Sequence, residues 1–283
     1  MKPLTLAPAL LLAACSAAGP ERAPDTARPT IVSLNPCTDA ILAEVTAPGQ
    51  LLAISHYSKE PGSSSMEAAT AARYRATGGT VEEVVVLDPD IVVASTFIAS
   101  ATRAALEDFG IRVETFGSAS TVEDSVAQVH ALAALSHGER QGEVLASKMA
   151  AAVERVRDGG DLIEAALWQP GGIVPGEQAL VADLLGRTGF ALYSGRRGMQ
   201  QADYLALEQV VADPPDVLLV AGSEAAQKHP VLDSLPGMRR ESFDTALLYC
   251  GGPTIIRAAA RLGEIRARAS RSRQGQDAGR AAS

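Results

Sequence analysis

Two stretches of the chain, VEEVVVLDPDIVVAS at residues 81–95 and LEQVVADPPDVLLVA at residues 207–221, have nearly the same pattern. Each begins with apolar residues at helical spacing, continues through a Pro-Asp pair, and ends in a run of β-branched and aliphatic residues. The first part predicts a short helix, the proline predicts its end, and the apolar run predicts a strand that is buried on both faces. The chain therefore carries two copies of one α/β unit, one in each half.

The same alternation of strand and helix continues on both sides of these stretches. In the first half we expect further strands at residues 30–34, 51–55 and 111–116, and in the second half at residues 163–168 and 246–250. Strands that alternate with helices at this spacing form parallel sheets joined by right-handed crossovers. The sequence therefore predicts an α/β fold with two lobes, each built on a sheet of parallel strands.

One long helix is predicted between the lobes. Residues 118–160 contain no proline, and a helix from Glu139 to Asp158 would be about 30 Å long at about 1.5 Å per residue, which is the width of a small lobe. We expect this backbone helix to join the two lobes. The predicted organisation is a signal peptide at 1–15, a flexible tether at 16–29, an N-terminal lobe at 30–119, connecting helices at 120–158, a C-terminal lobe at 159–269 and a disordered tail at 270–283.

The N-terminus has the pattern of an export signal. Lys2 precedes a short apolar run that is too short to span a bilayer, and the run ends in LAAC at residues 12–15. These four residues resemble the lipobox of bacterial lipoproteins, in which the cysteine, here Cys15, becomes the lipidated first residue. The alternative is an ordinary cleaved signal with an incidental cysteine. In either case we expect the mature protein to work outside the cytoplasm.

Composition and motifs exclude several classes of function. The net charge is −8, and basic residues gather only in the arginine-rich C-terminal stretch, so we expect no binding to nucleic acid. The chain has no G-x-G-x-x-G after the first strand, no Walker A sequence, no H-E-x-x-H and no G-x-S-x-G. The four histidines show no metal-ligand spacing. An enzyme is therefore disfavoured.

A glutamate stands at the same position in both repeated stretches. Glu82 and Glu208 align, together with Pro89–Asp90 and Pro215–Asp216. Any buried α/β unit uses valines and a Pro-Asp turn, so those identities indicate a common scaffold. The scaffold does not require a glutamate at this register, and helix capping is better served by Glu83. We interpret the two glutamates as functional.

The order of these motifs resembles the substrate-binding proteins of ABC importers for vitamin B12, iron-siderophores and haem. The resemblance covers residues 29–269 and includes RPTIVSLNPCTDAILAEV (28–45), LLAISHYSKEP (51–61) and ATGGTVEEVVVLDPDIVVAS (76–95). It implies a monomer without a cofactor that holds its ligand between the lobes and docks on an ABC permease dimer in the inner membrane. It also implies that Glu82 and Glu208 pair with arginine pockets on the two permease subunits, a contact that is strong in only one geometry.

Ligand residues are expected beyond the carboxyl ends of the parallel strands. The segments there are NPCTD, SHYSKEP, WQPGGIVPG and CGGP. The resemblance places an aromatic cleft residue at Tyr57, and Trp168, the only tryptophan, offers a second flat face, with burial in the core as its alternative. His56 is a candidate metal ligand, with a solvated loop histidine as its alternative. Gln200 and Tyr204 stand near a further family aromatic, a departure from the binders of vitamin B12.

Cys37 and Cys250 stand in corresponding loops of opposite lobes. Three interpretations remain open: two unrelated buried residues, a disulfide, which requires Cα atoms within about 7 Å, or soft ligation of a metal or a metal chelate.

The sequence thus predicts a periplasmic binding protein, anchored through Cys15, that captures a corrinoid, an iron-siderophore or haem and delivers it to an ABC permease without catalysing a reaction. The first alternative is a binder of a free transition-metal ion held by Cys37, His56 and Cys250. A cell-envelope α/β enzyme that uses the same cleft is the third and least favoured hypothesis.

Overall fold

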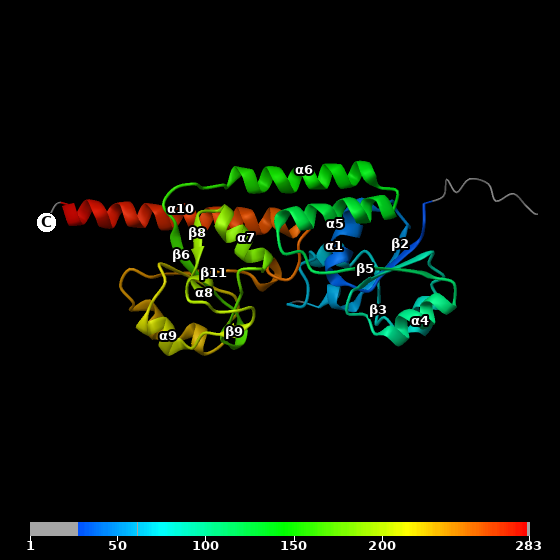
Figure 1. Ribbon diagram of the computed structural model, residues 1–283, viewed down its shortest axis with the longest axis horizontal. Coiled ribbons are helices and arrows are strands. Elements are labelled where there is room, and N and C mark those ends of the chain that lie inside the picture. Colours follow the sequence, from blue (N-terminus) through cyan, green and yellow to red (C-terminus); the bar gives the residue numbers. More distant parts are fainter. Residues whose placement is uncertain (1–27, 61, 282–283) are drawn as a thin grey trace, which may run out of the picture.

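The computed structural model describes residues 28–60 and 62–281. The predicted signal peptide, Cys15 and nearly all of the predicted tether lie outside these residues. Two α/β lobes lie side by side, and long helices cover both of them along one edge (Figure 1). The predicted fold class, two lobes with parallel sheets joined by a long helix, is confirmed.

The N-terminal lobe contains a five-stranded parallel sheet in the order β3-β2-β1-β4-β5. Its strands are β1 (Ile31–Ser33), β2 (Leu51–Ser55), β3 (Arg75–Thr77), β4 (Ile91–Ser95) and β5 (Arg112–Phe116). Its helices are α1 (Pro36–Val45), the 3₁₀ helix η1 (His56–Lys59), α2 (Ala68–Ala71), α3 (Val81–Val85) and α4 (Ser100–Asp108).

The C-terminal lobe contains a four-stranded parallel sheet in the order β11-β10-β6-β8 and a small antiparallel pair, β7-β9. Its strands are β6 (Ile163–Trp168), β7 (Ile173–Val174), β8 (Phe190–Leu192), β9 (Asp203–Tyr204), β10 (Val217–Val220) and β11 (Arg239–Ser242). Its helices are η2 (Pro170–Gly172), α7 (Leu180–Arg187), α8 (Tyr193–Arg196), α9 (Leu207–Ala212), η3 (Ala226–Lys228), η4 (Pro230–Asp233) and η5 (Thr245–Leu247).

The strand predicted at residues 246–250 is wrong. That segment begins in the 3₁₀ helix η5, and the outer strand of the sheet is the polar segment β11. An edge strand pairs on one side only and exposes part of its surface, so it tolerates the sequence Arg-Arg-Glu-Ser, which has no apolar pattern to reveal it.

The predicted backbone helix is present as α6 (Glu139–Arg155). It runs antiparallel to α5 (Val122–Leu135) and extends from one lobe to the other (Figure 1). The two helices approach closely at Gly142, where an added Cβ would lie 2.4 Å from the Cβ of Ala133. Helix α5 begins with a capping box between Thr121 and Asp124. The connecting segment is therefore a packed helix pair.

The last helix, α10 (Thr254–Ala281), lies beside α6 and continues to Ala281. This differs from the disordered tail predicted for residues 270–283. The stretch lacks proline and is rich in arginine and alanine, and its helix is already nucleated by the buried turn that contains Ile265 and Ala269. Extending an existing helix costs much less than starting one, so low sequence complexity did not imply an irregular chain.

A single hydrophobic cluster runs through both lobes. It includes Ile31 of β1, Met149 of α6, Ile163 of β6 and Leu262 of α10, all less than 2% exposed. Each sheet has one further hydrophobic cluster on its outer face, one in the N-terminal lobe and one in the C-terminal lobe. Because burial of apolar surface contributes roughly 25 cal/mol per Å², pulling the lobes apart would expose part of this shared core at a large cost.

The Pro-Asp pair of each repeated stretch has the same structural role. The carboxylate of Asp90 accepts the N–H of Thr30, 2.7 Å away, at the start of the neighbouring strand β1. The carboxylate of Asp216 accepts the N–H of Glu164, 2.9 Å away, at the start of β6. In both lobes the aspartate thus fixes the register of the two central strands. This part of the repeat is scaffold.

Candidate ligand-binding cleft

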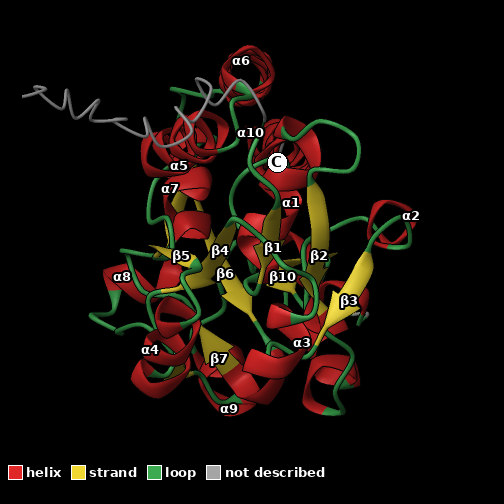
Figure 2. Ribbon diagram, turned by 90° about the vertical axis from the view of Figure 1, so that its right-hand side faces the viewer, coloured by secondary structure: helices red, strands yellow, loops and turns green. Residues whose placement is uncertain are grey.

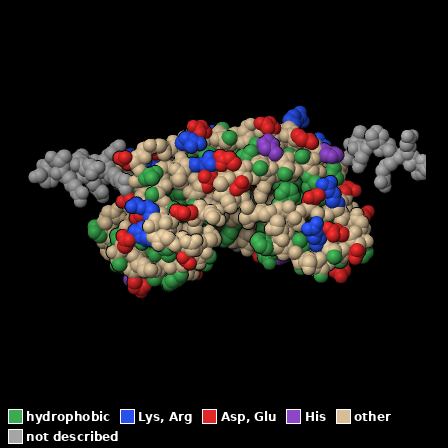
Figure 3. Space-filling model, viewed as in Figure 1, with side chains coloured by type: hydrophobic (Ala, Val, Ile, Leu, Met, Phe, Trp, Pro, Cys, Tyr) green, Lys and Arg blue, Asp and Glu red, His purple; other side chains and the backbone are tan. Residues whose placement is uncertain are grey.

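A cavity of about 470 Å³ lies between the two lobes. Figure 3 shows the molecule hollowed between the lobes on the edge opposite α6. Loops of both lobes and the inner face of α5 form its wall. The lining residues are Asn35, Cys37, Ser95, Phe97, Phe116, Gly117, Ser118, Ala119, Ser120, Gln128, Gln178, Ala179, Leu180, Gln201, Leu248, Tyr249, Cys250 and Gly251.

The order of the strands in the N-terminal sheet explains where one wall of this cavity lies. Asn35 follows β1 and Phe97 follows β4, and these two strands are neighbours although the chain leaves them toward opposite halves of the sheet. Loops diverge at such a point and leave a crevice beyond the carboxyl ends of the strands. Of the segments expected to hold ligand residues, NPCTD and CGGP contribute to the lining; NPCTD follows β1, whereas CGGP follows the 3₁₀ helix η5 and not a strand.

Two exposed aromatic side chains face the cavity from opposite lobes. Phe97 of the N-terminal lobe is 87% exposed, and Tyr249 of the C-terminal lobe is 46% exposed. Large apolar side chains that remain exposed in a concave surface indicate a binding site. Their flat faces suit a ligand with an extended apolar surface.

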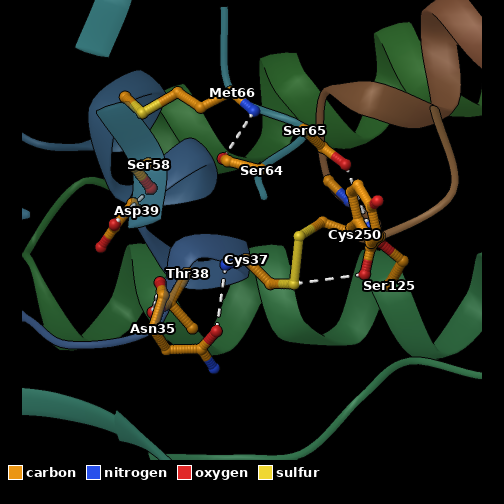
Figure 4. Close-up of a disulfide and its surroundings, with 12 residues drawn as sticks. Asn35, Cys37, Thr38, Asp39, Ser58, Ser64, Ser65, Met66, Ser125 and Cys250 are labelled. Carbon is orange, nitrogen blue, oxygen red and sulfur yellow. Dashed lines mark hydrogen bonds between the residues drawn. A yellow bond between two sulfur atoms is a disulfide. The ribbon is translucent and has the colours of Figure 1, made fainter. Parts of the chain in front are cut away.

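Cys37 and Cys250 form a disulfide that joins the two lobes at this cavity (Figure 4). Their Cα atoms are 5.0 Å apart. Of the three interpretations that the sequence left open, pairing is the one realised. Each sulfur is bonded to the other, so neither is a thiolate available to ligate a metal.

Hydrogen bonds and an ion pair surround the disulfide. The N–H of Cys250 donates to Ser65 Oγ over 3.1 Å, and the N–H of Gly252 donates to Ser125 Oγ over 2.7 Å. Arg257 of α10 donates to the Ser65 carbonyl oxygen and pairs with Glu67. We call this set the interlobe junction; its members are Cys37, Ser65, Glu67, Ser125, Cys250, Gly252 and Arg257. It fixes the closed end of the cleft.

Trp168 does not line the cleft. Its side chain is 1% exposed, and its indole N–H donates to the carbonyl oxygen of Leu205 over 2.9 Å. The segment that contains Leu205 covers the end of β6 and buries the ring in the outer core of the C-terminal lobe. The alternative of a core tryptophan is therefore the realised one.

The other predicted ligand residues lie at the surface and outside the lining of the cavity. Tyr57 is 49% exposed and contacts the ring of His56, with centroids 4.0 Å apart. Tyr204 is 65% exposed on β9. Gln200 lines a smaller depression beside the cavity, whereas its neighbour Gln201 reaches the cavity itself.

Sequence reasoning missed the aromatic pair and the loop after β5. Phe97 stands two residues after the end of β4, the strand of the first repeated stretch, and Tyr249 directly precedes Cys250. An aromatic residue in the loop after a buried strand was a signal for Phe97, whereas Tyr249 follows the 3₁₀ helix η5 and had no such signal. The choice of strands whose loops meet depends on sheet order, which the sequence pattern does not contain.

The described residues contain no group of three or more His, Cys, Asp or Glu side chains placed to hold a metal ion. In the same part of the chain, no helix is both long and apolar enough to cross a membrane.

The fold and the cleft define a two-lobed binding protein whose lobes are joined by a long helix. The chain belongs to the periplasmic binding protein family, whose model matches residues 31–239. This is a family of binding proteins and not of enzymes. No curated protein matches the sequence significantly.

Three solved structures show the same fold. The periplasmic haem-binding protein HutB of Vibrio cholerae is 18% identical, with a TM-score of 0.67 over 83% of this chain and 98% of that chain. The vitamin B12-binding protein BtuF of Vibrio cholerae is 15% identical, with a TM-score of 0.67 over 86% of this chain and 98% of that chain. An ABC transporter substrate-binding protein from Listeria monocytogenes is 15% identical, with a TM-score of 0.62 over 84% of this chain and 98% of that chain. At these identities the likeness shows the fold alone.

A buried carboxyl group stands two residues after Cys37. Asp39 is completely buried; its Oδ2 accepts the hydroxyl of Ser58 over 2.6 Å and the N–H of Ser55 over 2.9 Å (Figure 4). Its Oδ1 has no hydrogen-bond partner among the described residues. Burial raises the pKa of Asp39 from 3.8 to about 8, and the hydrogen bonds from serines oppose this only in part.

We predict that Asp39 makes the protein less stable as pH rises. Between pH 3.8 and about 8 the folded protein retains a proton that the unfolded chain has released, so the free energy of unfolding falls across this window. Asp39→Asn should flatten the dependence in urea unfolding from pH 5 to 8. Asp108→Asn, exposed on α4, is the control. A variant Asp39→Asn with the wild-type slope would contradict the assignment.

We also predict that the disulfide contributes roughly 2–5 kcal/mol to stability, because it closes a long loop of the unfolded chain. The double variant Cys37→Ser with Cys250→Ser should unfold at a lower urea concentration than the oxidised protein. Reductant should shift the wild type to the midpoint of the variant and leave the variant unchanged. Equal midpoints for the oxidised wild type and the variant would show that the two cysteines do not pair.

Proposed function

We propose that this protein works in the periplasm, where it binds a metal chelate between its lobes and delivers it to an ABC permease dimer. The observation that carries the proposal is the cavity between the lobes with Phe97 and Tyr249 facing it from opposite sides. Its volume lies in the range typical of small-molecule sites, roughly 300–1,000 Å³. Proteins of this fold whose structures are known bind haem or vitamin B12, which supports a metal chelate as the ligand. Another is a substrate-binding protein of an ABC transporter, which supports an ABC permease as the partner.

The alternative of a bare transition-metal ion has less support. Two of its three proposed ligands, Cys37 and Cys250, are joined in the disulfide. The third, His56, lies outside the cavity lining, and its Nδ1 is 3.4 Å from the carbonyl oxygen of Thr77. A chelate brings its own metal ligands, so the protein needs to supply only shape and a few polar contacts.

An enzymatic role is not part of the proposal. None of the described residues that line the cavity is a histidine, an acid or a lysine, the side chains that most often activate a serine. The serines of the lining are Ser95, Ser118 and Ser120. Binding and release are sufficient to account for the cleft.

The anchor remains part of the proposal. Cys15 in the LAAC segment would carry the lipid, and residues 16–29 would tether the lobes to the membrane.

Glu82 and Glu208 are the proposed docking residues. Both side chains are exposed in the first turns of the equivalent helices α3 and α9, and among the described residues neither makes a hydrogen bond or an ion pair. The adjacent Glu83 differs, because its carboxylate accepts the Thr77 hydroxyl over 2.7 Å and the Gly78 N–H over 2.6 Å. The Thr77 bond is the main cause of a lowered pKa at Glu83. Glu83 thus has a structural role in holding the turn before α3, whereas Glu82 and Glu208 have no such role in the described part of the chain.

The position of the two helices favours docking. Figure 2 shows α3 and α9 on the side of the molecule away from α6 and α10, and Figure 3 shows that the hollow between the lobes opens on that side. One exposed carboxylate on each lobe fits a partner built of two subunits. Docking there would place the cleft over the translocation path.

We predict that Glu82→Lys combined with Glu208→Lys abolishes transport and leaves the affinity of the purified protein for its ligand unchanged. The two introduced lysines would be repelled by the cationic pockets that we propose on the permease. Uptake by cells and binding by calorimetry measure the two effects separately. Glu143→Lys on the opposite edge, in α6, is the matched control and should transport normally. Loss of ligand affinity in the double variant would contradict the docking role.

A further inference from the structure

We propose, on the basis of the function proposed above, that the cleft selects chelates without net charge and discriminates against anionic ones. The chelates of this general kind fall into two electrostatic classes. Some, such as vitamin B12 and ferric trihydroxamates, carry no net negative charge. Others, such as haem with its two propionates and ferric tricatecholates, are anionic.

The wall of the cavity contains no charged side chain. Among the described lining residues the polar groups are amides and hydroxyls only, and the remaining residues are apolar or glycine. An anionic ligand in this site would therefore have no cation to pair with.

Three arginines of the C-terminal half of the chain are held in ion pairs outside the lining of the cavity. Arg197 pairs with Glu164 and Asp213, Arg187 with Asp183 and Glu123, and Arg257 with Glu67. Reorienting any of them toward a ligand would break an ion pair or the interlobe junction. These guanidinium groups are therefore committed to the protein scaffold.

The amides of the lining can donate and accept at once. The side-chain oxygen of Asn35 accepts the N–H of Cys37, and that of Gln201 accepts the N–H of Gly176. Both side-chain NH₂ groups therefore remain available as donors. Gln128 donates its NH₂ to the carbonyl oxygen of Gly117, which leaves its oxygen as an acceptor. Neutral donors and acceptors of this kind match ligand carboxamides or hydroxamates.

Desolvation supplies the discrimination. A carboxylate or phenolate that moves from water into a site without a cation loses hydration that uncharged amides do not replace. We expect this penalty to lower the affinity by at least about 100-fold, the factor that corresponds to about 2.7 kcal/mol.

The test is a titration of the full mature protein with four probes: vitamin B12, a ferric trihydroxamate, haem and a ferric tricatecholate. We expect at least one uncharged probe to bind about 100-fold more tightly than either anionic probe. An anionic probe that binds as tightly as the best uncharged one would overturn the selectivity and leave the proposed function intact. Binding of none of the four would instead contradict the proposed function.

A charge-insertion variant tests the cause. Ser118 is exposed and lines the cavity, so Ser118→Arg should raise the affinity for the anionic probes by at least about tenfold while changing the affinity for the uncharged probe much less. Ser147→Arg, exposed on α6 outside the cavity, is the matched control and should change neither. Equal effects of the two variants would show that charge in the cleft does not determine selection, and would overturn the proposal.

Discussion

The packing of both lobes onto α5, α6 and α10 is the constraint on which the rest of the structure depends. One hydrophobic cluster passes from the N-terminal sheet through α6 to the C-terminal sheet, so the lobes share a core. The interlobe junction adds a covalent bond at the closed end of the cleft. Both features oppose separation of the two lobes.

This constraint has a consequence for capture and release. A cleft with a fixed closed end binds by complementarity of a preformed surface, with Phe97 and Tyr249 already exposed before the ligand arrives. In the proposed function, the permease promotes release by docking on the two exposed glutamates, Glu82 in α3 and Glu208 in α9, one on each lobe. We propose that the neutral wall selects the ligand and that the surface glutamates direct its delivery.

The fold was predictable from the sequence to the extent that local patterns determine it. The repeated stretches predicted buried parallel strands in both lobes, and the proline-free segment predicted α6. The cleft was less predictable, because its wall depends on which loops meet across a sheet and across two lobes. Trp168 carried a suitable side chain but lies under a covering segment, whereas Phe97 was overlooked although its loop follows the central pair of strands. Cys37 and Cys250 are 213 residues apart, and only the packed lobes bring them together.

The central claim, capture of an intact chelate between the lobes, is tested most directly by native mass spectrometry of the protein purified from its own periplasm, together with its absorption spectrum. The account predicts one non-covalent ligand per chain whose mass is that of a metal chelate, with a visible absorption band that disappears when the ligand is removed by unfolding. A bare metal ion bound to the chain, or conversion of a substrate in the absence of any transporter, would contradict it.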